Sequence, residues 1–202
     1  MQQLTLKYSH VVQGSFEVKR LNLLLVFQVN CPGCFMDAIP LLDNLSTKYQ
    51  HQLGCAALST AFEDFDKNTL DNTRLLVTTG ELVGETKKAL HNNFGMSKFS
   101  MPTQFPILFD EIVPGHSLWK DADLRIREAN QTTGNLANEQ LTKAIKAYYH
   151  GMPQVGYTFS ANLFKGTPTF VLYDDTLKIL GHWFGHVGQD KISKEIEQHI
   201  VN

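Results

Sequence analysis

Two cysteines separated by Pro-Gly, Cys31 and Cys34, are the residues of this sequence best suited to chemistry. Residues 20–29 before them are rich in Leu, Val and Phe, which predicts a strand buried on both faces. From Cys34 onward the apolar residues recur at helical spacing, and Pro32 suits the first helical position because its missing N–H costs nothing there. The pair is therefore expected on a strand-to-helix turn.

This placement favours thiol–disulfide exchange. The free amides and the dipole at the start of the helix point at the sulfur of Cys31 and favour its thiolate. Cys34 comes one turn later, close enough to form a disulfide with Cys31 and more buried. Cys31 is therefore predicted to attack a substrate disulfide, and Cys34 to resolve the mixed disulfide that results.

Zinc binding and inert thiols are the alternatives for this pair. For a zinc site, the candidate further ligands are His182 and His186, which lie around a predicted strand far along the chain. On a strand these two side chains would be about 13 Å apart, too far to share one metal ion. No metal site is therefore predicted. Cys55 falls within a predicted core strand, where a buried and unreactive thiol is expected.

The remaining pattern predicts an α/β domain. Strands at 20–29 and 53–60 flank a helix from Cys34 to about Tyr49, kinked at Pro40, in a right-handed βαβ unit. Further along we expect two helices within 68–93 and a strand at 105–110. Residues 111–134 are expected to be mostly loop with a helical piece at 119–128, followed by a helix at 138–150 and a loop to Gly166. The chain then ends with strands at 169–173 and 178–184, joined by an Asp-Asp turn, and a helix at 188–200. These elements predict a central sheet of four or five strands, with helices on both faces and residues 20–29 in the middle.

A second motif, Gly166-Thr167-Pro168, directly precedes one of these strands. With the CxxC turn, the Thr-Pro, the hairpin and the last helix, the chain resembles the thioredoxin superfamily. The stretches CAALST and FPILFD, and the long segment between the two motifs, are similar to its TlpA-like and peroxiredoxin-like branch. The resemblance implies one domain over residues 1–202 with a three-layer α/β/α fold and a central mixed sheet. Its core would span about 20–60 and 105–200, with a helical insertion at about 62–104.

The resemblance also implies roles for residues around the cysteines. In the superfamily this proline is cis and packs against the active-site sulfur, so Pro32, Gly33, Thr167 and Pro168 would form the edge on which a substrate docks. The substrate would be a disulfide-bearing protein or a small thiol or disulfide. Electrons would come from another thiol protein or from glutathione, and no dissociable cofactor is implied.

Three positions depart from the superfamily pattern. Leu25 stands where thioredoxins carry a buried acid, Asn30 stands where a large side chain usually precedes the first cysteine, and Pro40 comes six residues after Cys34 instead of five. These departures predict slow general disulfide reduction. A peroxiredoxin-like peroxidase is one alternative, although Gln28 occupies the place of the threonine that such enzymes need. A thioredoxin-fold interaction module with little turnover is another.

Composition excludes other classes of function. The 202 residues include 18 Lys and Arg and 20 Asp and Glu, a net charge of −2, which gives no electrostatic reason to bind nucleic acid or anionic lipid. No apolar run approaches the roughly 18 residues of a membrane span. Residues 1–19 do not have the charged and apolar regions of a secretory signal, so a cytoplasmic protein is expected. The acidic residues Glu63, Asp64 and Asp66 are interpreted as a solvated loop.

Overall fold

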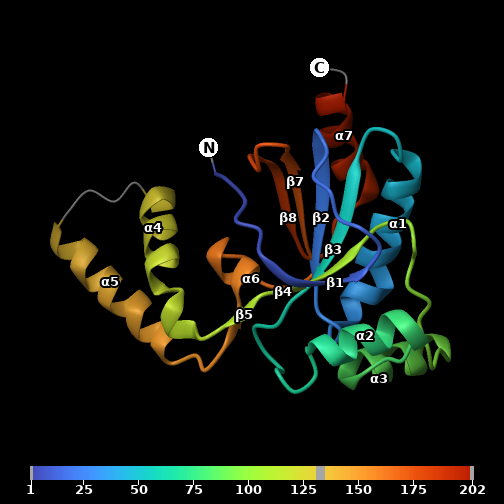
Figure 1. The fold of residues 1–202 in the computed structure, drawn as a ribbon, viewed down its shortest axis with the longest axis horizontal. Helices are drawn as coiled ribbons and strands as arrows, with labels where there is room; N and C mark the ends of the chain where they lie inside the picture. Colours follow the sequence, from blue (N-terminus) through green and yellow to red (C-terminus); the bar gives the residue numbers. More distant parts are fainter. Residues whose placement is uncertain (1, 131–134, 201–202) are drawn as a thin grey trace.

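The computed structural model describes residues 2–130 and 135–200, and at its centre is a mixed sheet of six strands (Figure 1). The spatial order β1-β4-β3-β2-β7-β8 is formed by β1 (Tyr8–Gln13), β2 (Leu21–Phe27), β3 (Gly54–Ser59), β4 (Ile107–Asp110), β7 (Thr169–Asp174) and β8 (Ile179–Phe184). Strand β2 is parallel to β3 and antiparallel to β7, and β3 is also parallel to β4. The predicted central position of the strand before the cysteines is therefore confirmed.

Helices lie on both faces of this sheet and make the three layers (Figure 1). One face is covered by α1 (Ile39–Lys48), α2 (Leu70–Thr79), α3 (Gly84–Phe94) and α7 (Gln189–Ile200). The other face is covered by α6 (Tyr157–Ala161) and the N-terminal segment. A hairpin of α4 (Trp119–Asn130) and α5 (Asn135–His150) projects beyond α6 and packs with it in a third apolar cluster.

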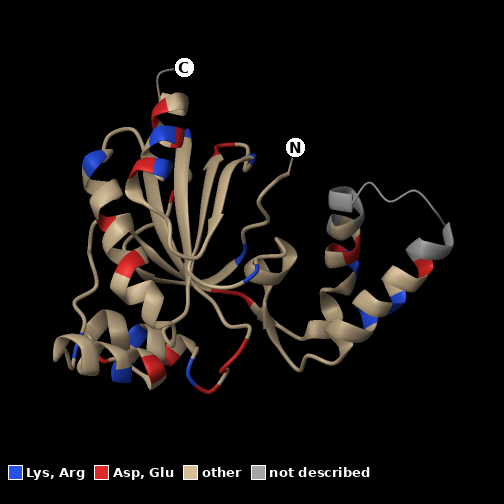
Figure 2. Ribbon diagram, turned by 180° about the vertical axis from the view of Figure 1, so that it is seen from behind, with Lys and Arg blue, Asp and Glu red and all other residues tan. Residues whose placement is uncertain are grey.

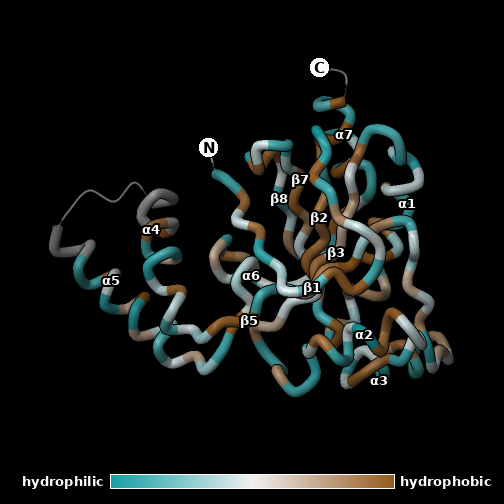
Figure 3. Tube along the Cα trace, viewed as in Figure 1, coloured by the Kyte–Doolittle hydropathy of each residue, from teal (hydrophilic) through white to brown (hydrophobic). Residues whose placement is uncertain are grey.

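Strand β2 supplies both apolar layers with side chains. Leu23 and Leu25 belong to the cluster under α1 and α7, whereas Leu24 and Val26 belong to the cluster under α6. All four are at most 1% exposed. Each fully buried side chain of this kind contributes about 1.5–3 kcal/mol relative to an exposed one. Figure 3 shows the same concentration of hydrophobic residues along the middle strands.

Two parts of the sequence prediction are wrong. The sheet has six strands because β1 pairs with β4, and β1 was not predicted because most of its residues are exposed and its pairing with β4 is irregular. The segment 152–166, predicted as a loop, contains α6 and the short strand β6 (Val155–Gly156), which pairs with β5 (Ile112–Val113). In the segment 111–134, by contrast, α4 confirms the helical piece predicted at 119–128; residues 131–134 lie outside the described residues.

Charged residues are concentrated on the outer helices and in the loops rather than on the central strands (Figure 2). Among residues 2–130 and 135–200, the structure contains no helix that is both long enough and apolar enough to cross a membrane.

One buried carboxylate holds α6 against the sheet. Asp110, at the end of β4, accepts hydrogen bonds from the hydroxyl of Thr60 (2.7 Å) and from the backbone N–H groups of Thr158 (2.9 Å) and Phe159 (3.2 Å). The backbone approaches closely at Gly156, where a Cβ would lie 2.6 Å from the carboxylate. Burial raises the pKa of Asp110 to about 6, although the three hydrogen bonds act in the opposite direction.

This raised pKa predicts a pH-dependent stability. An Asp in the unfolded chain has a pKa of about 3.9, so the contribution of Asp110 is fully present below about pH 4 and is lost as the pH rises to about 6. At about 1.4 kcal/mol per pKa unit, the loss is about 2–3 kcal/mol. Urea unfolding of the native protein and of Asp110→Asn at several pH values should show a difference that changes by this amount between pH 4 and 7. A constant difference would contradict the prediction.

Candidate active site

Cys31 and Cys34 lie at the carboxyl end of β2, at the start of a helical turn. The turn begins at Pro32, and the N–H of Cys34 donates to the carbonyl oxygen of Cys31 (3.0 Å). Cys31 is half-buried, whereas Cys34 is completely buried within the cluster under α1 and α7. The two sulfur atoms are neighbours at 2.6 Å. The structure thus places one accessible and one shielded thiol side by side.

The residues after this turn form a π-helix over Cys34–Ala38 before α1 begins at Ile39. The N–H of Ile39 donates to the carbonyl of Cys34, five residues back. This wider turn accommodates the additional residue between Cys34 and Pro40, which then occupies the first turn of α1, where a proline is tolerated. The kink predicted at Pro40 is therefore replaced by a π-turn before it.

The two thiols have opposite electrostatic environments. A hydrogen bond from Cys34 is the largest cause that lowers the pKa of Cys31 to about 7, with Thr167 contributing in the same direction. Burial and the charge of Glu63 act against it. The pKa of Cys34 is raised well above its usual range, first by burial and then by its neighbour Cys31. At neutral pH, Cys31 is thus the thiol that ionises.

Thr167 and Pro168 lie beside the cysteines although they are distant in sequence. The thiol of Cys31 donates to the carbonyl oxygen of Thr167 (3.6 Å), and the Thr167–Pro168 peptide bond is cis. Pro168 and Gly33 line the same small groove of about 100 Å³, together with Ala38, Leu41, Phe170 and Val187. Pro32, Gly33, Thr167 and Pro168, the residues proposed for docking, are thus gathered around the accessible sulfur.

The other residues considered in the sequence lie apart from this pair. His186 is at the rim of the groove and faces Asp37 (3.5 Å), whereas His182 packs against the ring of Phe164. Within the part of the chain that the structure describes, no three His, Cys, Asp or Glu side chains gather as metal ligands. Cys55 lies on β3, and burial raises the pKa of its thiol to about 12.

Two solved structures are similar to this chain over their whole length. A thiol-disulfide isomerase from Corynebacterium glutamicum superposes with a TM-score of 0.60 at 16% identity, covering 100% of this chain and 97% of that one. A thioredoxin-like superfamily protein superposes with a TM-score of 0.57 at 16% identity, covering 100% and 98%. The chain has a thioredoxin-like fold. No protein-family model matches the sequence, and neither does any curated protein.

In this thioredoxin-like fold, Leu25 departs from the residue type that the superfamily resemblance predicts. Its side chain is completely buried, with Ala57 opposite it on β3 and Phe170 opposite it on β7. It belongs to the same apolar cluster as Cys34. The surroundings of the shielded thiol therefore contain a hydrocarbon side chain where a proton acceptor is expected.

Two amides next to the cysteines were not recognised as site residues from the sequence. Gln28 is buried; its side-chain oxygen accepts from the hydroxyl of Thr167 (3.1 Å), and its NH₂ donates to the carbonyl of Glu63 (3.5 Å). Asn30 donates to the carboxylate of Asp64 (2.8 Å) and accepts from the N–H of Glu85 (2.6 Å). Because these partners are distant in sequence, local spacing contains no signal for them.

Asn30 therefore caps α3 from outside that helix. Glu85 is in the first turn of α3, whose own capping residue, Val83, makes no side-chain hydrogen bond to it. Gly84 approaches so closely that a Cβ there would collide with the Asn30 oxygen. The loop containing Asp64, previously interpreted as merely solvated, is also bound to the cysteine turn through this amide.

Alkylation kinetics should distinguish the three thiols. In the reduced protein we expect iodoacetamide to modify Cys31 first, with a rate that follows a pKa near 7, because Cys34 and Cys55 are shielded and have raised pKa values. Cys34→Ala removes the hydrogen bond to Cys31 and should shift this rate profile to higher pH. Cys34→Ser, which keeps a donor, should shift it less. Faster labelling of Cys34 or Cys55 would show that the nucleophile is assigned incorrectly.

Because Asn30 caps α3, removal of its side chain is expected to destabilise that helix first. Asn30→Ala should lower the free energy of unfolding by about 0.5–2 kcal/mol, the usual cost of losing a helix cap, and should speed hydrogen exchange at the Glu85 amide. Gly84→Ala should produce the same pattern by displacing the Asn30 side chain. Asn93→Ala, at the exposed far end of α3, is the control. An unchanged exchange rate at Glu85 in Asn30→Ala would rule out the capping role.

Proposed function

We propose that this protein is a thiol–disulfide oxidoreductase, with Cys31 as nucleophile and Cys34 as resolving thiol. The difference between the two thiols is the observation that carries the proposal. Cys31 is accessible and has a pKa of about 7, whereas Cys34 is buried and remains protonated. An asymmetric pair of this kind is suited to sequential attack and resolution rather than to structural cross-linking.

In the first step the Cys31 thiolate attacks one sulfur of a substrate disulfide. A bond forms between Cys31 and that sulfur, the substrate S–S bond breaks, and the other substrate sulfur leaves with the electron pair and takes up a proton. Cys34 then loses its proton and attacks the Cys31 sulfur, which closes the Cys31–Cys34 disulfide and releases the second substrate thiol. The protein gives up two electrons, so the pair itself carries the redox equivalents without a bound cofactor.

Substrate docking is proposed at the edge formed by Pro32, Gly33, Thr167 and Pro168. The groove beside Gly33 and Pro168 is small and largely apolar, which suits one side chain next to the substrate cysteine. We therefore propose disulfide-bearing proteins or small disulfides as substrates. Another thiol protein or glutathione would return the electrons, in the cytoplasm, where thiol donors keep such pairs reduced.

Insulin reduction with dithiothreitol as donor tests this activity. We expect the native protein to accelerate insulin precipitation, Cys31→Ser to abolish the acceleration, and Cys34→Ser to accumulate a mixed disulfide with the substrate. Cys55→Ser is the matched control and should behave as the native protein, because Cys55 lies on β3 away from the pair. Acceleration that persists in Cys31→Ser would overturn the proposal. Mixed disulfides captured in cells by Cys34→Ser would identify the partners.

The raised pKa of Cys34 predicts that resolution limits turnover. Above pH 7 the attack by Cys31 should level off, since its thiolate is already formed, while resolution should continue to accelerate as Cys34 ionises. Acid-quenched single-turnover samples should therefore contain more mixed disulfide at pH 7 than at pH 9. Leu25→Asp, which supplies a carboxylate, should speed resolution, with about a hundredfold typical of general base help. Equal amounts of mixed disulfide at the two pH values would contradict the prediction.

A further inference from the structure

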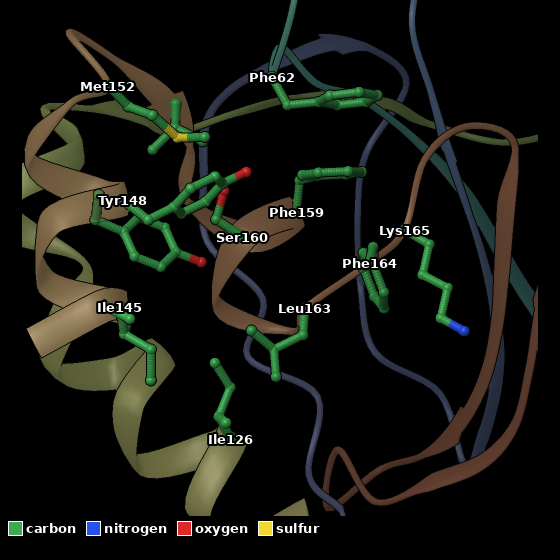
Figure 4. A pocket seen from close by; sticks show the side chains of 13 residues that line it. Phe62, Ile126, Ile145, Tyr148, Met152, Phe159, Ser160, Leu163, Phe164 and Lys165 are labelled. Atoms are coloured by element: carbon green, nitrogen blue, oxygen red, sulfur yellow. The ribbon is translucent and has the colours of Figure 1, made fainter. Parts of the chain in front are cut away.

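A cavity of about 460 Å³ lies between α5, α6 and the segment that connects α6 to β7 (Figure 4). It is separate from the groove beside Cys31, since the two share no lining residue. Its volume falls within the range of about 300–1,000 Å³ that is typical of small-molecule sites. The proposed thiol–disulfide exchange does not require this cavity.

The walls of the cavity are largely apolar. Phe62 and Phe159 stack with ring centroids 4.0 Å apart, and Phe164 meets Phe159 edge to face at 6.2 Å. In Figure 4 these three rings form one side of the cavity, and Ile145 and Met152 lie on the opposite side. An occupant therefore needs an apolar body.

Two hydroxyl groups in the lining make no hydrogen bond with any residue that the structure describes. Ser160 is 7% exposed and Tyr149 is 6% exposed, and within the described residues neither hydroxyl makes a hydrogen bond. Neither hydroxyl oxygen is completely buried, so each can reach an occupant of the cavity. Burial, followed by the charge of Tyr148, raises the pKa of Tyr149 to about 12, so that its hydroxyl remains a donor at neutral pH. The lining thus offers two donors for an acceptor group on a ligand.

The charge of the lining favours an anion. Lys165 is exposed at the cavity, and none of the described lining residues is Asp or Glu. Figure 4 shows Lys165 beside Phe164, next to the aromatic wall. A negatively charged acceptor is therefore favoured over a positively charged group.

We propose that this cavity binds a small amphipathic carboxylate. Its apolar chain or ring lies among Phe62, Phe159 and Ile145, and its carboxylate accepts hydrogen bonds from the hydroxyls of Ser160 and Tyr149. Lys165 adds electrostatic attraction at the mouth. Since Lys165 is only two residues before Thr167, the occupied cavity adjoins the segment that carries the docking edge of the active site.

Calorimetric titration of the full chain with decanoate, decanol and decylamine tests the proposed chemistry. We expect saturable binding of one decanoate, weaker binding of decanol and the weakest binding of decylamine. Across octanoate, nonanoate and decanoate, the affinity should rise by about fourfold per methylene group. No saturation by decanoate, or an affinity for decylamine that equals it, would overturn the proposal.

Variants locate the binding in this cavity. Tyr149→Phe and Ser160→Ala keep the packing and should each weaken decanoate binding by about tenfold or more, the usual effect of removing a hydrogen bond to a charged group. Tyr8→Phe, an exposed tyrosine on β1, is the control for the first. Lys165→Met should weaken decanoate but not decanol, whereas Lys191→Met on α7 should change neither. If all cavity variants bind as the native protein does, the site is elsewhere and the proposal fails. Because titration requires no thiol chemistry, its outcome is independent of the insulin assay.

Discussion

Strand β2 is buried on both faces and hydrogen-bonded along both edges, to β3 on one side and β7 on the other. The turn with the two cysteines follows this strand directly, so its position is set by the best-packed part of the molecule. The neighbour β7 begins directly after Pro168, which places the Thr-Pro segment against the same end of β2. The pairing of β2 with β7 thus brings the CxxC turn and the Thr-Pro segment together.

The two thiols influence each other in opposite directions. A proton on Cys34 stabilises negative charge on Cys31, and that negative charge in turn makes ionisation of Cys34 harder. The pair therefore behaves as a unit that holds one proton at neutral pH. Burial of Cys34 among hydrocarbon side chains, including Leu25, reinforces this state and makes removal of the remaining proton the difficult event. In the proposed mechanism, the burial that keeps the proton on Cys34 therefore favours attack by Cys31 and slows the later resolution of the mixed disulfide.

The sequence predicted those elements whose burial is periodic. The apolar run of β2, the helical spacing after Cys34 and the isoleucines of α7 all reflect one-sided or two-sided burial and were recognised. Strand β1 was missed because its side chains are largely exposed, and α6 because it has only five residues and is anchored by Asp110 from another part of the chain. The proximity of the two cysteine sulfurs was predicted from local spacing. The contacts of Gln28 and Asn30 were not, since they form only when the chain folds.

The π-turn after Cys34 shows how this fold tolerates a change in chain length. One residue more than in the usual motif is absorbed within a single turn, and both the cysteine before it and the proline after it keep their structural roles. A sequence motif that fixes the number of residues between the cysteine and the proline is not matched at such a point, whereas a structural motif that follows the path of the backbone is matched. Insertions of this kind let sequences diverge in spacing while the path of the backbone persists, so a fold of this kind is better recognised by shape than by alignment.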